Sequence, residues 1–190
     1  TFSFLKMPTR KDLPLILLLL VQASLISLHF LKFPIFPQFR SVDFEIHVRL
    51  IRDYAGGVMP VLDSQVLYYG VHYLLSSLAF IDQGGVLMLS RYGMGTLAAL
   101  SPLAVYLVSL RLFESNKSAL AVTSVYVFSG FVWFGMVFNT GLYPNFYSIL
   151  ASLWLIAFSL QYIHTKSWIS SLPLAIIFLA NALLSHYTVL

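Results

Sequence analysis

The sequence predicts an all-α integral membrane protein built as a multi-span helical bundle. Of the 190 residues, 59% are hydrophobic and 9% are charged, whereas about a quarter of the residues in soluble domains are charged. The apolar residues also gather in runs of about 20, the length at which a helix crosses a ~30 Å hydrocarbon core. Together these observations exclude a soluble globular domain.

Five apolar runs are long enough to span a bilayer. Lys6, Arg10 and Lys11 precede the first run, which lacks a small-x-small cleavage site, so we expect an uncleaved signal anchor and a cytoplasmic N-terminus. The chain opens with Thr1 and closes just after an apolar run, so residues 1–190 are interpreted as a single transmembrane domain that is a fragment of a longer protein. The expected spans are 14–33, 86–110, 118–138, 145–163 and 168–186.

Charge bias decides the path of a shorter apolar segment, residues 66–81. If this segment lies at the outer interface without crossing, the basic residues of the later short loops join those of the N-terminus in the cytoplasm, as the positive-inside rule requires. We therefore expect five crossings and an outer loop over residues 34–85 that holds two interfacial helices. The turn at 139–144 then reaches the same extracytoplasmic face.

The first of these interfacial helices is predicted over residues 43–55 and carries candidate site residues. On a helical wheel, an apolar stripe is bordered by Asp43, His47 and Tyr54. Asp43 and His47 lie one turn apart, at the boundary between lipid and water. Asp43 is either a helix N-cap or a reactive carboxylate. His47 is a proton carrier, a metal ligand or an interfacial ring bonded to lipid or backbone. Glu45 is a site residue or half of a surface ion pair with the arginine four positions later.

Other polar residues are expected near the same face. Arg91 lies near the outer end of the run 86–110, where its guanidinium either holds a phosphate by two hydrogen bonds or reaches lipid headgroups or an outer-loop carboxylate. Tyr143 and Asn145 lie in NTGLYPN, a sequence typical of a turn. His186, at the end of the last span, would emerge on the same side.

The basic residues do not indicate a nucleic-acid partner. The formal charge of +4 comes from basic residues that are scattered and mostly flank apolar segments, which is the pattern of membrane-topology charges. The chain has no cysteine, which excludes disulfides, CxxC metal sites and thiol nucleophiles.

Several motifs occur in an order that resembles a known superfamily. A first span is followed by D-x-x-x-H, from Asp43 to His47, within SVDFEIHVRLIRDYAGG. A Tyr-Gly-x-His segment comes next, with Tyr69, Gly70 and His72, then LSRYGMGTLAALSPLAVYLVSLRLF and the turn GLYPN. This order resembles the GT-C superfamily of membrane glycosyltransferases, which includes protein mannosyltransferases and oligosaccharyltransferase catalytic subunits. The resemblance covers most of residues 10–190, corresponding to the N-terminal half of such an enzyme.

The resemblance implies a GT-C-like fold and transfer of a sugar from a polyprenyl-phosphate donor at the extracytoplasmic face. The acceptor would be a glycan, a lipid or a protein, and membrane lipids would surround the site. The catalytic acid falls by position on Asp43, with Glu45 and His47 nearby. Arg91, His72, Tyr143 and Asn145 are the expected substrate-binding residues. No cofactor is certain, and a divalent cation such as Mg²⁺ or Mn²⁺, held by Asp43 and Glu45, is left open.

Two other classes of function remain as alternatives. Outer acidic residues could gather cations for a transporter or channel subunit, although such proteins usually show paired halves with interrupted helices. The chain could also be a noncatalytic membrane scaffold or a lipid-binding subunit. A large extracytoplasmic domain or further spans would favour the transferase, and an inverted repeat would favour transport.

Overall fold

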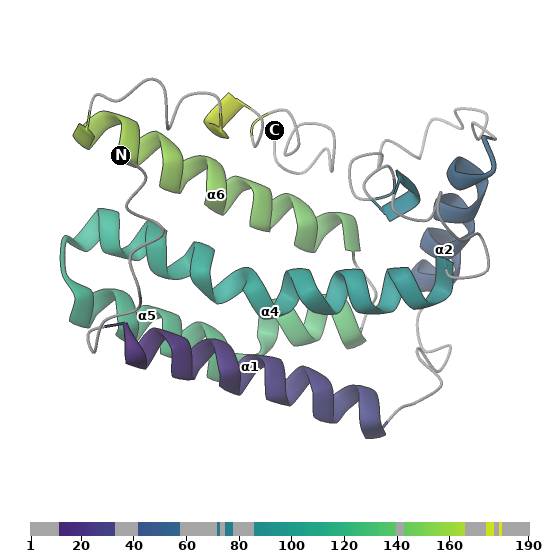
Figure 1. Ribbon diagram of the computed structural model, residues 1–190, viewed down its shortest axis with the longest axis horizontal. Helices are drawn as coiled ribbons and strands as arrows, with labels where there is room; N and C mark the ends of the chain where they lie inside the picture. Colours follow the sequence, from purple (N-terminus) through teal and green to yellow (C-terminus); the bar gives the residue numbers. More distant parts are fainter. Residues whose placement is uncertain are drawn as a thin grey trace.

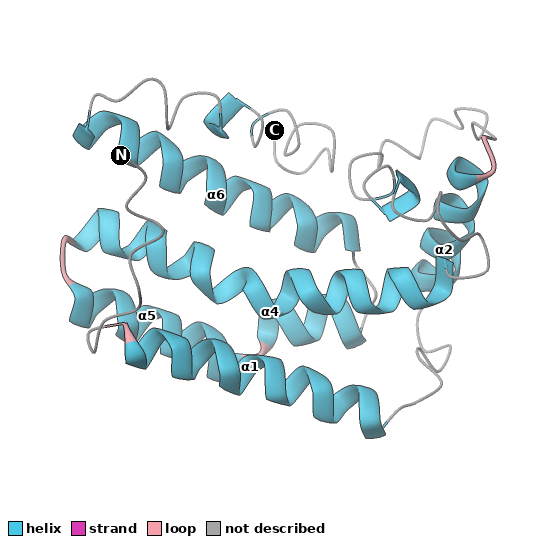
Figure 2. Cartoon of the chain, in the orientation of Figure 1, coloured by secondary structure: helices cyan, strands magenta, loops and turns pink. Residues whose placement is uncertain are grey.

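The computed structural model describes residues 12–32, 42–57, 72, 75–77, 86–139, 143–165, 174–176 and 179. The regular elements within these ranges are helices (Figure 2). In chain order they are α1 (Leu13–Lys32), α2 (Val42–Ala55), α4 (Val86–Phe113), α5 (Asn116–Ser129), the π-helix η3 (Phe131–Asn139) and α6 (Tyr143–Thr165).

The long helices lie side by side and form an elongated bundle. Figure 1 shows α1, α4 and α6 running along the long axis of the molecule, with α5 beside them. At one end α1 finishes, α4 and α6 begin, and α2 lies across the bundle (Figure 1). We name this the α2 end. The opposite end carries the connection between α4 and α5 and the end of α6, so successive long helices alternate in direction.

Four helical segments are long and apolar enough to cross a membrane: Leu13–Lys32, Tyr92–Phe113, Asn116–Val137 and Asn145–His164. They coincide with four of the five predicted spans, which confirms a helical membrane protein. The fifth predicted span, 168–186, lies outside the described residues except for 174–176 and 179. The predicted interfacial segment 66–81 is likewise described only at residues 72 and 75–77.

One narrow face of α1 contacts the rest of the bundle. Gln22 and Ile26 are buried, and Phe30, one turn further, packs against the hydrophobic core. Leu20 and Leu28, on other faces of the helix, are exposed. Because lipid tails are as apolar as leucine, a helix in a bilayer needs no polar outer face. The exposed leucines of α1 are therefore interpreted as its lipid-facing surface.

Two glycines of α4 allow neighbouring segments to approach its backbone. A Cβ atom at Gly95 would lie 2.8 Å from Cζ of Phe30, and one at Gly93 would lie 2.8 Å from Cδ2 of Leu75. Both distances are shorter than real Cβ contacts, so a larger residue at either position would force the Phe30 ring or the Leu75 side chain to shift. Gly95 thus brings α1 close to α4, and Gly93 does the same for the segment that contains Leu75.

Helix α4 has 28 residues and contains Pro102. It changes direction near its middle (Figure 1). Proline lacks a backbone N–H and its ring crowds the carbonyl four residues earlier, which is the usual cause of a bend in a membrane helix. The first half of α4, residues 86–101, is the part that reaches the α2 end.

The third predicted span, 118–138, is not one continuous helix. Gly130 ends α5 in the left-handed conformation, with φ of 61°, and η3 follows directly. Both Phe134 and Gly135 donate their backbone N–H to the Gly130 carbonyl, at 2.9 and 3.0 Å. This span therefore divides into an α-helix and a π-helix at a glycine that adopts positive φ without strain.

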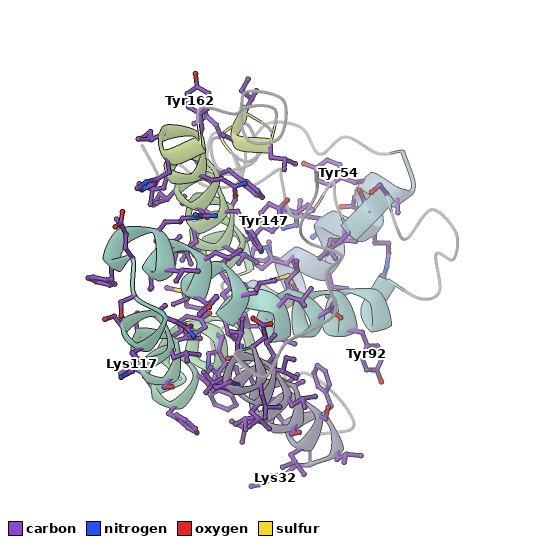
Figure 3. The ribbon with its side chains drawn as sticks, turned by 60° about the vertical axis from the view of Figure 1, so that its left-hand side comes forward. Lys32, Tyr54, Tyr92, Lys117, Tyr147 and Tyr162 are labelled. Carbon is purple, nitrogen blue, oxygen red and sulfur yellow. The ribbon has the colours of Figure 1, made fainter. Side chains whose placement is uncertain are left out.

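The predicted turn at 139–144 is shorter than expected. Helix α6 already begins at Tyr143, so Pro144 and Asn145 belong to its first turn. Proline is compatible with that position because the first N–H groups of a helix have no partner within the helix. Further along α6, Tyr147 points into the bundle, whereas Tyr92 of α4 points away from it (Figure 3).

At the opposite end, a tight connection joins α4 to α5. Glu114 adopts positive φ of 49°, and the Ser115 hydroxyl caps α5 by accepting the backbone N–H of Ser118 at 3.3 Å. His164 Nδ1 of α6 lies 3.9 Å from the Glu114 carboxylate, a long and exposed contact that contributes little to stability. Lys117 points outward from this end (Figure 3).

The close approach at Gly95 gives a direct test of the α1–α4 packing. We expect Gly95→Ala to lower the free energy of unfolding by about 1–3 kcal/mol, because the new methyl group must displace the Phe30 ring in a packed interface. The measurement is thermal unfolding of the purified protein in detergent. Gly135→Ala is the matched control, since nothing lies within 4 Å of its added Cβ. Equal stability of the two variants would contradict the proposed packing.

Candidate functional site

Helix α2 carries the predicted catalytic residues and is anchored in the protein core. The structure gives it 14 residues, Val42–Ala55, close to the predicted range 43–55. Val48, Ile51 and Ala55 are buried in the core cluster, while Arg52 on the polar side is exposed. The predicted apolar stripe is therefore confirmed, but it packs against protein, including α4, where the interfacial hypothesis had placed lipid.

Two of the predicted site residues meet at the α2 end. Nδ1 of His47 lies 2.9 Å from Nε2 of His72, and the two ring centroids are 4.9 Å apart. His47 is 6% exposed and His72 is 1% exposed. The His47 side chain is therefore buried against the protein and not exposed to lipid. Its partner is a buried histidine from a segment 25 residues later.

His47 and Tyr54, which were predicted to border the apolar stripe of α2, both lie near the segment that contains His72. The rings of Tyr54 and His72 have centroids 6.5 Å apart, so His72 lies near both border residues, His47 and Tyr54, which are two turns apart on α2. Leu75 and Ser76 of the same segment are also buried. The border that was predicted to meet water and lipid is covered by the chain itself along this part of the helix.

The hydrogen bond between two imidazole rings limits the charge of the pair. One ring must donate an N–H and the other must accept it, so the pair holds at most one extra proton while the bond lasts. Burial, reinforced by the neighbouring His72 ring, lowers the pKa of His47 from 6.5 to about 3. His47 is therefore neutral at physiological pH, which agrees with a structural hydrogen bond better than with a charged group at the membrane surface.

The lowered pKa of His47 predicts acid sensitivity. The unfolded chain binds a proton at His47 below pH 6.5, whereas the folded chain resists protonation until about pH 3. The stability contributed by neutral His47 is thus complete above pH 6.5 and is lost as the pH falls from 6.5 toward 3. At pH 5 the loss is about 2 kcal/mol, from ~1.5 pH units at ~1.36 kcal/mol each. Thermal unfolding between pH 7.5 and pH 5 measures it.

Two variants separate this effect from general acid denaturation. His47→Gln, which cannot be protonated, should flatten the pH dependence between pH 7.5 and pH 5. His164→Gln is the control, because His164 is exposed, and it should keep the dependence of the wild type. An unchanged pH dependence in His47→Gln would show that His47 is not held neutral by folding.

The other predicted site residues also belong to helices that reach the α2 end. Arg91 is the sixth residue of α4, and Tyr143 and Asn145 lie in the first turn of α6. Asn145 is partly buried. The side-chain placements of four predicted residues lie outside the described part of the structure, as does His186: Asp43, Glu45, Arg91 and Tyr143.

The start of α2 bears on the two predicted roles of Asp43. The helix begins at Val42, so Asp43 lies in its first turn and not at the N-cap position. A carboxylate in a first turn is still favoured by the positive end of the helix dipole. On the exposed side of α2, Arg49 Nε lies 3.9 Å from the Asp53 carboxylate, an ion pair at the i,i+4 spacing of a helix.

A metal ion held by Asp43 and Glu45 together is disfavoured by the helix. Positions two apart on an α-helix lie on nearly opposite faces and do not meet, and both residues lie within α2. Across the described ranges, no group of three His, Cys, Asp or Glu residues gathers to hold a metal. Asp43 and His47, four positions apart, share a face, so Asp43 with an additional ligand is the arrangement that the helix permits.

Sequence reasoning missed a second polar group, inside the bundle. Gln22 of α1, Ser101 of α4 and Tyr126 of α5 are joined by hydrogen bonds, and Gln22 and Ser101 are buried. The signal was present in the sequence as a glutamine within the first apolar run and a Ser-Pro pair within the second. It was not recognised because the spacing of these residues along the chain gives no indication that they meet.

Comparison with known proteins adds no assignment. A scan against protein-family models, a search of curated proteins and a search of solved structures each found no match. Function is therefore inferred from the residues and their geometry.

Proposed function

We propose that this protein is a membrane glycosyltransferase of the GT-C type, which moves a sugar from a polyprenyl-phosphate donor to an acceptor at the extracytoplasmic face. The observation that carries the proposal is the position of α2. This helix bears Asp43 and is seated at the end of the bundle where α4 begins near Arg91 and α6 begins at Tyr143. Several expected site residues thus lie on helices that converge on one end of a membrane protein.

The seating of α2 suits chemistry on a lipid-linked donor. Its apolar face packs into the core through Val48 and Ile51, and Arg49 and Arg52 remain exposed on the other side. A helix held at this end of the apolar spans lies at headgroup depth, where the phosphate of a donor diffusing in the bilayer would arrive. The acid therefore need not move to meet its substrate.

The proposed reaction is a single displacement with Asp43 as general base. The acceptor hydroxyl oxygen forms a bond to the sugar carbon as its proton passes to the Asp43 carboxylate. The bond between the sugar carbon and the phosphate oxygen breaks, and the lipid phosphate leaves with the electron pair, inverting the configuration at carbon. The phosphate is already a good leaving group, so a second carboxylic acid is not required.

Positive charge near the phosphate would stabilise the leaving group. Arg91, in the first half of α4, is the candidate, because a guanidinium binds two phosphate oxygens at once. A divalent cation bound by Asp43 and a ligand other than Glu45 would supply the same stabilisation. His47 and His72 are assigned to holding α2 against its neighbouring segment, since their facing nitrogen atoms already bond to each other.

One observation bears on the alternative of a transporter. The span Asn116–Val137 is interrupted at Gly130, and interrupted helices build ion sites in transporters. The indole Nε1 of Trp133 donates to the Val127 carbonyl at 3.1 Å, so this carbonyl at the break is satisfied by the chain itself. The interruption therefore supports transport less than it would if the carbonyl faced an open cavity.

The proposal predicts that Asp43→Asn abolishes most of the activity. Replacement keeps the shape of the side chain but removes the base, so we expect the rate of sugar transfer to fall by about 10²–10⁴-fold. The assay uses the full-length protein in membranes supplied with polyprenyl-phosphate sugars and measures product formation.

Asp53→Asn is the matched control for this experiment. Asp53 belongs to the same helix but pairs with Arg49 on the exposed side, so its loss should leave transfer within about twofold of the wild type, as for an exposed ion pair. Equal turnover of Asp43→Asn and Asp53→Asn would remove Asp43 from the chemistry. Ion flux through vesicles in the absence of any transfer would favour the transporter.

A further inference from the structure

A cluster of hydrogen-bonded polar groups lies inside the bundle, away from the α2 end. It joins Gln22 of α1, Ser101 of α4 and Tyr126 of α5. Gln22 is 0% exposed and Ser101 is 1% exposed. Polar side chains facing the interior of a membrane bundle usually pair with one another or with backbone groups, and here the backbone group can be identified.

The carbonyl of Ala98 explains the cluster. In a regular α-helix it would accept the N–H of residue 102, but that residue is Pro102, which has no N–H. An unsatisfied carbonyl is costly where no water is available. Two donors replace the missing one: Ser101 Oγ at 2.7 Å and the Gln22 side-chain amide from the neighbouring helix.

The remaining bonds fix how Gln22 is oriented. Ser101 Oγ donates to the Ala98 carbonyl and accepts from Tyr126 OH at 2.7 Å and from Gln22 Nε2 at 3.2 Å, so its donor and both lone pairs are used. Turning the amide over would set Gln22 Oε1 against the Ala98 carbonyl. Oε1 instead lies buried with no hydrogen-bond partner among the described residues, a cost that the bonds to Nε2 offset.

The part of α4 held in this way is the part that carries α2. Ala98 and Met94 lie in the first half of α4, before Pro102, and they share the core cluster with Val48 and Ile51 of α2. The first half of α4 is therefore the platform on which α2 is seated, and its direction depends on the bend. A bend at proline without a partner for the freed carbonyl would be free to vary.

We propose that Gln22 is a positioning residue for the α2 end. By donating to the carbonyl that Pro102 leaves without a partner, it fixes the direction of the first half of α4 and so the place of α2. The proposal rests on the proposed transferase function only where activity is measured. The structural claim is that Gln22 is needed to bond the Ala98 carbonyl because residue 102 is proline and has no N–H.

A double-mutant cycle between Gln22 and Pro102 tests this dependence. In the wild-type background, Gln22→Leu removes a donor from the Ala98 carbonyl and should lower the Tm by about 2–8 °C. In Pro102→Ala, the N–H of residue 102 can bond to that carbonyl. Adding Gln22→Leu to this variant should therefore lower the Tm by less than a third of the decrease seen in the wild-type background. Ser27→Ala, at an exposed position of α1, is the control and should cost the same in both backgrounds.

Distances between spin labels show whether α2 moves. The chain has no cysteine, so labels can be placed at Arg52→Cys on α2 and at Leu112→Cys beyond the bend, two exposed positions. We expect Gln22→Leu to broaden or shift this distance distribution and to leave it unchanged when Pro102→Ala is also present. The pair Leu112→Cys and Val125→Cys, both beyond the bend, is the control and should not respond.

The conservative variant and the activity assay complete the test. Gln22→Glu should retain a near wild-type distance distribution, because a protonated carboxyl can donate to the same carbonyl. If Gln22→Leu alone does not fold, the double variant still should. Changes in Tm and distance do not depend on catalysis, so a protein without transferase activity would refute the proposed function and leave this inference intact.

Two results would overturn the inference. One is an effect of Gln22→Leu that is equally large with Pro102 and with Ala at position 102, or a double variant that does not fold. The other is an unchanged distance between labels on α2 and beyond the bend in Gln22→Leu, which would make the glutamine a local packing residue with no influence on α2.

Discussion

Backbone polar groups within a hydrocarbon layer need partners inside the protein, and this constraint governs how the bundle is assembled. The chain breaks its helical hydrogen bonding at Pro102 and at Gly130, both within candidate spans. Gln22 and Ser101 supply donors to the carbonyl freed by the proline, and the indole of Trp133 supplies one at the glycine. The polar side chains buried at these places thus follow from interruptions that the fold itself introduces.

The bend in α4 links the hydrogen bonds at the Ala98 carbonyl to the position of the α2 end. In the first half of α4, the side chain of Leu75 packs closely against Gly93, and the ring of Phe30 packs closely against Gly95. It also shares a core with α2, and the His47–His72 hydrogen bond ties α2 to the next segment. A catalytic carboxylate on α2 would therefore be supported by packed helices on one side and a buried polar pair on the other, which is the support that a reacting group needs to stay in place.

Sequence reasoning predicted the elements better than their contacts. Long apolar runs gave four of the spans to within a few residues, because length and hydropathy decide membrane insertion. The 3.6-residue periodicity gave the buried face of α2, including Val48 and Ile51. It could not reveal that His72 would cover the border of that helix, since no periodic pattern links residues 25 apart. The break at Gly130 was also missed, because a single glycine in an apolar run is compatible with a continuous helix.

The account depends most on which side of the membrane each end of the bundle occupies. Single cysteines can be placed at Arg49 on α2, at Asn145 at the start of α6 and at Lys117 at the opposite end, and labelled with a membrane-impermeant maleimide in sealed cells. We predict labelling from the extracytoplasmic side at positions 49 and 145, and labelling of position 117 only after permeabilisation. Labelling of positions 49 and 117 from the same side, or of 49 and 145 from opposite sides, would contradict a single extracytoplasmic site.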